Sequence, residues 1–175
     1  AMSGFFAQSF LTRDNYQDLL KDCFQTMKLF GSKVAFLPLG GSGKDWQQEG
    51  CTAYQQMVSR LRTAGDMAKQ EGITIGIRTG MGAKFDKKLL KKVGSSQIKV
   101  YYNFQDAADH HRDICKELRK LGAQRIVQIH ASNTDSVNLQ EDPEINLPKI
   151  RKTLDKMKWS GWLVVERSRD VKRVR

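Results

Sequence analysis

The sequence of 175 residues has no apolar run near the roughly 20 residues that a membrane-spanning helix needs. It also lacks a basic start followed by an apolar core, so no secretory signal peptide is predicted. Its three cysteines are odd in number and widely spaced, and they form no C-x-x-C pair, which argues against a zinc knuckle. These absences predict a cytoplasmic protein with reduced thiols and no membrane partner.

Positive charge is in excess, with a formal net charge of +11. Such an excess raises the local concentration of anions such as phosphate esters or nucleic acid. Many of the cations, however, fall on predicted helix faces, where a solvated surface is the simpler interpretation. They are Lys84, Lys87, Lys88, Lys91 and Lys92 in one stretch, and Lys149, Arg151, Lys152, Lys156 and Lys158 in another.

Short apolar runs alternate with amphipathic stretches along the whole chain. The runs are too apolar for strands with one wet face, so they indicate a parallel sheet covered by helices. The predicted strands are 33–39, 73–77, 98–104, 125–130 and 162–166, with a weaker run at 5–10. The predicted helices are 15–30, 54–70, 85–93, 112–121 and 147–157.

Alternating units of this kind build either a doubly wound sheet or a barrel. Nearly every predicted strand ends on a polar residue, which favours a barrel, because the strand ends of a barrel surround one mouth. A doubly wound sheet would gather its site at one switch point instead. Complete barrels need about 250 residues. We therefore expect residues 1–175 to form a single α/β domain, an incomplete TIM-barrel-like parallel barrel of about six β-α units.

Four strand ends carry the chemistry of the sequence. The runs Arg125-Ile-Val-Gln-Ile-His130 and Gly161-Trp-Leu-Val-Val-Glu166 each stop on a side chain that can bind a metal ion. Two other strands end on Arg78 and Asn103. A carboxylate at the end of a buried run must be paired or used, which marks Glu166 in particular.

The segments ITIGIRTG, IKVYYNFQDA, RIVQIHASNTDS and WSGWLVVERS resemble, in this order and spacing, the xylose-isomerase-like barrel family of sugar phosphate isomerases and epimerases. The resemblance covers the third to eighth strands of that family, whose first two β-α units and closing helix have no counterpart here. It implies a divalent metal (Mn²⁺, Mg²⁺ or Zn²⁺) held by Glu, Asp, His and Glu, with paired glutamates moving a proton between sugar carbons.

Only half of that ligand set carries over to this sequence. The histidine becomes His130 and the last glutamate becomes Glu166, which are the catalytic candidates and the metal ligands if a metal is retained. The first glutamate is replaced by Arg78 and the aspartate by Asn103, while Asp106 stands where the family has asparagine.

Two interpretations of Arg78 stay open. In the first, its guanidinium replaces the metal electrostatically, so that the pocket binds an anionic or polyhydroxy ligand with no metal, and Glu166 or Asp106 pairs with it. In the second, Arg78 makes a structural salt bridge across an inactive mouth. An arginine cannot act as a base at neutral pH, so epimerisation with two bases is not expected in either case.

Further candidates for substrate binding lie in loops. The turn Leu39-Gly-Gly-Ser-Gly-Lys44 is not a Walker A loop, but its backbone N–H groups and Lys44 could hold an anion. Trp46 could stack on a sugar face, and Asn133 follows His130 on the same predicted loop. The alternative is a plain, flexible βα loop.

Three functions follow in order of preference. The first is an isomerase or epimerase acting on a sugar or sugar phosphate with an altered or lost metal site. The second is a non-catalytic carbohydrate- or anion-binding barrel, or a barrel fragment. The third, an apurinic-endonuclease-like enzyme, needs several metals with many histidine ligands, and the sequence has only three histidines. Nucleic acid is therefore not the expected partner, whereas self-association through open sheet edges is.

Overall fold

The protein is described here from a computed structural model that covers residues 2, 4–39, 44–132 and 139–165. Five strands form one sheet and follow one another in chain order. They are β1 (Val34–Pro38), β2 (Thr74–Arg78), β3 (Ile98–Asn103), β4 (Ile126–Ala131) and β5 (Trp162–Val165). A sheet that adds each new strand on the same side, with helices between the strands, is typical of an α/β barrel rather than of a doubly wound fold.

The predicted barrel-like α/β class is thus confirmed, with five strands in the described part of the chain. The weak apolar run at 5–10 forms no strand. Its first residues belong instead to the short helix α1 (Gly4–Ala7), and Phe5 and Phe10 pack edge to face with ring centroids 5.3 Å apart. Both rings are buried, so the apolar character of the run reflects core packing and not a sheet.

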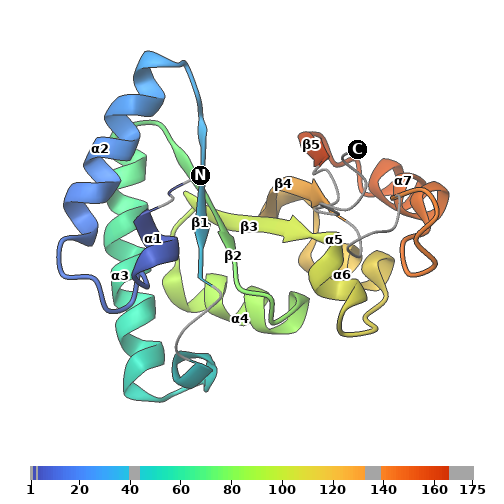
Figure 1. The fold of residues 1–175 in the computed structure, drawn as a ribbon, viewed down its shortest axis with the longest axis horizontal. Helices are drawn as coiled ribbons and strands as arrows, with labels where there is room; N and C mark the ends of the chain where they lie inside the picture. Colours follow the sequence, from blue (N-terminus) through green and yellow to red (C-terminus); the bar gives the residue numbers. More distant parts are fainter. Residues whose placement is uncertain (1, 3, 40–43, 133–138, 166–175) are drawn as a thin grey trace, which may run out of the picture. The chain divides into compact units, whose positions relative to one another are not determined.

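The chain divides into two compact units. The first comprises residues 1–79 and 87–100 and contains helices α2 (Tyr16–Leu29) and α3 (Thr52–Gln70), which lie beside β1 and β2 (Figure 1). A one-turn 3-10 helix, η1 (Lys44–Gln47), contacts α3. In register, Val34 lies opposite Thr74 and Pro38 opposite Arg78, all in parallel pairing.

Helix α3 shows why this sequence is helical. Its buried residues recur at helical spacing, and they are Tyr54, Met57, Val58, Leu61, Ala64, Gly65 and Ala68. The helix begins after Cys51, whose Sγ accepts a hydrogen bond from the backbone N–H of Tyr54. It ends shortly before Gly72, whose φ of +64° suits the left-handed turn that leads into β2.

The second unit comprises residues 80–86 and 101–175. Helix α4 (Ala83–Val93) begins in it, and its other helices are α5 (Phe104–Ala108), α6 (Ile114–Leu121), α7 (Leu147–Lys156) and the 3-10 turn η2 (Ala123–Arg125). Helix α6 contacts α7, and Leu118, Leu121 and Ile129 are fully buried. Strands β4 and β5 pair in parallel with Gln128 opposite Trp162.

Helix ends in this unit are capped by side chains. Asp113 and Asn146 accept hydrogen bonds from the backbone N–H groups of Lys116 and Lys149, 2.9 and 3.0 Å away. Pro148 occupies the first turn of α7, where no N–H partner is needed. None of the helices in the described ranges has the length and apolar character of a membrane span.

Candidate functional site at the strand ends

Asn103, the last residue of β3, is held by two donors on one side of its amide. Its side chain is 3% exposed. The amide oxygen accepts a hydrogen bond from the backbone N–H of Asp106, 3.3 Å away, and another from the Ser132 hydroxyl, 2.7 Å away. The first of these bonds makes Asn103 the N-cap of α5. Because a backbone N–H can only donate, the amide oxygen must face it and the amide nitrogen faces the other way.

His130 on β4 lies where that nitrogen points. The Asn103 amide nitrogen and the His130 Nδ1 are 3.3 Å apart. The imidazole ring also stands edge to face with the Tyr101 ring, at 5.7 Å between centroids. The Tyr101 hydroxyl in turn accepts a hydrogen bond from Gln128 at 3.4 Å. The structure therefore brings two of the candidate residues, Asn103 and His130, into direct contact.

Arg78 and Trp46 belong to the first unit. Arg78 ends β2 with its side chain half-buried, and its backbone carbonyl accepts a hydrogen bond from Leu39 at 2.9 Å. Trp46 lies in η1 and is only 2% exposed, so its indole is part of the interior. Lys44 begins η1, but its side chain lies outside the described residues, as do Asn133 and Glu166 altogether.

Asp106 makes its contacts in this region through its backbone N–H and carbonyl groups. Its N–H caps onto Asn103, and its carbonyl oxygen accepts hydrogen bonds from Arg112 Nη2 at 2.6 Å and from His110 Nδ1 at 2.9 Å. The side chain is half-buried. Asp106 thus links the Asn103 pair to a second polar cluster.

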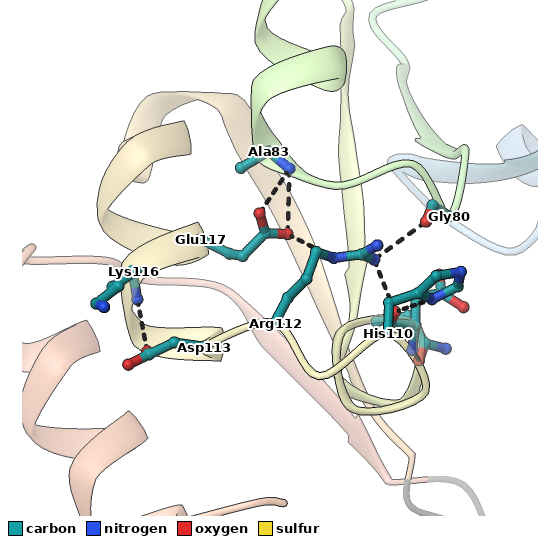
Figure 2. Close-up of polar contacts among 9 residues, drawn as sticks. Gly80, Ala83, His110, Arg112, Asp113, Lys116 and Glu117 are labelled. Atoms are coloured by element: carbon teal, nitrogen blue, oxygen red, sulfur yellow. Dashed lines mark hydrogen bonds and ion pairs between the residues drawn. The ribbon is translucent and has the colours of Figure 1, made fainter. Parts of the chain in front are cut away.

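That second cluster was not predicted from the sequence. Figure 2 shows that Arg112 reaches from the segment before α6 to the carbonyl of Gly80, 3.0 Å away, and that Glu117 accepts from the backbone N–H of Ala83 at the start of α4. Arg112 and Glu117 also form an ion pair at 3.5 Å. This cluster of Gly80, Ala83, Arg112 and Glu117 is a brace. It ties the loop after β2 and the start of α4 to the segment before α6 and to α6 itself.

The local pattern offered little sign of this brace. Glu117 lies in a helix turn that reads as an ordinary solvated face, and its partner Ala83 is 34 residues away. The one usable signal is Gly82, whose φ is +88° and whose missing Cβ would lie 3.1 Å from both Arg112 Nε and Glu117 Oε2. A larger residue there would push the ion pair away from the start of α4.

Tyr102 lies beside the same cluster with a buried hydroxyl that has no hydrogen-bond partner. Burial, and then the negative charge of Glu117, raise the pKa of the Tyr102 phenol well above its ordinary value. Tyr102 is therefore a neutral residue at physiological pH.

At the described strand ends, Arg78 and Asn103 stand where the sequence resemblance implies a glutamate and an aspartate. In ranges 2, 4–39, 44–132 and 139–165, no three His, Cys, Asp or Glu side chains form a group that could hold a metal ion. A guanidinium cannot ligate a cation, and the amide oxygen of Asn103 already accepts from two donors. His130 Nδ1 faces the Asn103 amide nitrogen, which has no lone pair to offer a cation.

Comparison with known proteins gives a consistent fold. A family model described as xylose isomerase-like TIM barrel matches residues 4–174. No curated protein sequence matches the chain. Among solved structures, an AP endonuclease of family 2 from Brucella melitensis has a TM-score of 0.76 at 15% identity, with 90% of this chain and 65% of that chain covered.

Two further structures are similar. D-Psicose 3-epimerase from Clostridium cellulolyticum H10, solved with D-tagatose, has a TM-score of 0.71 at 14% identity and covers 88% of this chain. The IOLI protein, solved with a bound zinc atom, has a TM-score of 0.72 at 14% identity and covers 97% of this chain and 72% of its own. The present chain spans less than two thirds of the Brucella protein and only 56% of the epimerase. At these identities the likeness is one of fold.

Proposed function

The chain belongs to the xylose isomerase-like TIM barrel family. We propose that it binds a sugar or sugar phosphate at its strand ends, where the divalent-metal site of the family is altered or lost. The observation that carries the proposal is the contact of Asn103 with His130. In the family pattern both positions hold metal ligands, whereas here an amide nitrogen faces the imidazole. Sugar epimerases among the similar structures support the substrate class.

Arg78 is the proposed contact for an anionic group of the ligand. It ends β2, where the family pattern has a glutamate, and so exchanges a negative charge for a permanent positive one. A guanidinium offers paired N–H donors to a phosphate or carboxylate group, which a sugar phosphate carries. Lys44, in the loop after β1, is a second cation proposed for the same anion, and Asn133 a polar contact to the sugar.

Glu166 is the remaining proposed acid–base residue, and His130 is its proposed partner. In the family scheme two glutamates exchange a proton with the sugar, and here only the position of the last one holds a glutamate. One base can remove and return a proton on the same face of a carbon, which exchanges hydrogen without inverting the centre. The proposed chemistry is therefore limited to exchange or isomerisation on one face.

The test of this proposal is a binding and exchange experiment on the purified chain with EDTA present. Aldose and ketose phosphates are titrated by calorimetry, and exchange of substrate C–H for deuterium is followed by proton NMR in D₂O. We expect binding that Arg78→Gln weakens about tenfold or more, the size of one lost charge-assisted contact. The proposal is contradicted if no sugar phosphate binds either in EDTA or in a second titration with Mn²⁺ in place of EDTA.

A non-catalytic binding barrel is the alternative that the same experiment separates. The part-buried pairing of Asn103 with His130 favours it, because it occupies two polar groups that catalysis would otherwise use. Binding without deuterium exchange would establish the binding protein. Exchange that Glu166→Gln abolishes would establish the enzyme.

A further inference from the structure

We infer that Asn103 is a positioning residue that holds His130 in the tautomer with its proton on Nε2, so that Nδ1 accepts a hydrogen bond and Nε2 is a hydrogen-bond donor. The inference deepens the proposed function and rests on it for the identity of the ligand. It rests on geometry alone for the tautomer.

The backbone N–H of Asp106 fixes the orientation of the Asn103 amide. Its oxygen lies 3.3 Å from the backbone nitrogen of Asp106, and that N–H has no means of accepting a hydrogen bond. Turning the amide over would place its NH₂ group against this donor in a site where the side chain is 3% exposed. An unsatisfied buried donor pair costs about 1–3 kcal/mol, which selects the observed orientation.

The Ser132 hydroxyl reinforces the same choice. It lies 2.7 Å from the Asn103 oxygen and is itself 4% exposed. A hydroxyl can rotate to donate or accept, so on its own it would not decide the orientation. Together with the Asp106 N–H it fills both lone pairs of the amide oxygen.

The tautomer of His130 follows from that orientation. The Asn103 nitrogen carries two hydrogens and no free lone pair, so across the 3.3 Å contact it donates and His130 Nδ1 accepts. A neutral imidazole has one acceptor nitrogen and one protonated nitrogen. The proton therefore resides on Nε2.

Nδ1 is the His130 nitrogen that faces position 103, so its lone pair is directed at the Asn103 amide. An aspartate at position 103 would accept a hydrogen bond there instead and would move the imidazole proton to Nδ1. With a proton on Nε2, His130 suits an oxygen acceptor, which in a sugar ligand means a carbonyl, hydroxyl or phosphate oxygen.

His110 provides an internal reference of the opposite kind. Its Nδ1 lies 2.9 Å from the carbonyl oxygen of Asp106, which can only accept, so the proton of His110 resides on Nδ1. The same residue, Asp106, thus fixes His130 through its N–H by way of Asn103 and fixes His110 through its carbonyl. One protein should therefore show both tautomers.

The experiment is a long-range ¹H–¹⁵N correlation spectrum of protein labelled with ¹⁵N-histidine, recorded about two pH units above the ordinary imidazole pKa of about 6.5. With three histidines in the chain, His110→Gln and His111→Gln assign every signal. We expect the Nε2–H tautomer for His130 in the wild type and in Ser132→Ala, which retains the Asp106 bond, and the Nδ1–H tautomer in Asn103→Asp.

A wild-type spectrum with His130 in the Nδ1–H form would overturn the inference, whatever the variants do. Asn103→Leu is a second variant of similar size. It removes the hydrogen-bond donor, so His130 should show a mixture of the two tautomers. Because no ligand is needed, the spectrum is independent of the sugar titration. A failed titration counts against the proposed function alone, and the wrong tautomer counts against this inference alone.

Discussion

Both carboxylate oxygens of Glu117 lie 3.1 Å from the backbone nitrogen of Ala83, so a residue of α6 caps the start of α4. A carboxylate there meets the unpaired N–H groups and the positive end of the helix dipole. The Glu117 side chain is 14% exposed, and Arg112, its ion-pair partner, is 24% exposed. The brace therefore fixes the loop that follows Arg78. Arg78 itself is the residue proposed to contact the anion.

Glu117→Ala should lower the free energy of unfolding by about 2 kcal/mol, since it removes the cap and leaves the part-buried Arg112 without its counter-charge. Glu117→Gln should cost less, because one acceptor remains. Urea unfolding followed by circular dichroism gives both values. Asp155→Asn, which disturbs an exposed pair with Arg151, is the matched control and should change stability little. Equal effects of Glu117→Ala and the control would contradict the brace.

Tyr102→Phe should leave stability unchanged or raise it by up to about 1 kcal/mol, because the hydroxyl that it removes is buried without a partner. Tyr101→Phe is the control on the neighbouring residue, whose hydroxyl accepts from Gln128, and it should destabilise. Thermal unfolding of the two variants compares them directly. A loss of stability in Tyr102→Phe would mean that the hydroxyl has a partner.

Tyr102 also makes the stability depend on alkaline pH. Its folded-state pKa is raised, so the folded protein retains a proton that the unfolded chain loses above the ordinary tyrosine pKa of about 10. This contribution is fully present below that pH and declines above it. The decline should be absent in Tyr102→Phe, which urea midpoints measured between neutral and strongly alkaline pH would reveal.

Asp113 produces the opposite dependence at acid pH. The hydrogen bond from the Lys116 N–H, helped by Lys149, lowers the pKa of the Asp113 carboxyl. Its stabilisation is present above the ordinary pKa of about 3.9 and is lost as the pH falls through the lower, folded-state value. Asp113→Ala should cost about 1 kcal/mol at neutral pH and progressively less under acid conditions. A cost independent of pH would show that the charge has no part in the cap.

Strand β5 should mediate self-association. It ends the sheet, and Trp162 and Val165 are 76% and 65% exposed, although both are large apolar side chains. Sedimentation velocity should show a mass above the 19.9 kDa of one chain that rises with concentration. Trp162→Glu should abolish the rise, and Leu29→Glu, at an equally exposed apolar residue on α2, should not. A monomer at all concentrations would refute the prediction.

Much of the fold could be predicted because it depends on local patterns. The predicted strand at 73–77 is found at Thr74–Arg78, and the predicted helix at 147–157 is found at Leu147–Lys156. A short β-branched run indicates the strand, and Pro148 is typical of the first turn of a helix, which Asn146 caps in the structure. The predicted helix at 112–121 begins later, at Ile114, because Asp113 is its cap and Arg112 is used by the brace.

The contacts of the site could not be predicted in the same way. Asn103 and His130 were both identified as strand ends, but their pairing joins residues 27 apart and depends on the Asp106 cap that orients the amide. Helix α5, which creates that cap, is five residues long and has too few positions to show a period. Sequence patterns indicate which residues reach a strand end, while hydrogen-bond direction emerges only from their packing.

We propose that the strand ends have exchanged a metal site for one built from hydrogen bonds and fixed charge, and Mn²⁺ titration calorimetry distinguishes the two kinds of site. The wild type should show no binding at millimolar Mn²⁺, and Arg78→Glu combined with Asn103→Asp should bind the ion, because the change restores two carboxylate ligands. Stoichiometric binding by the wild type that His130→Ala abolishes would contradict the account.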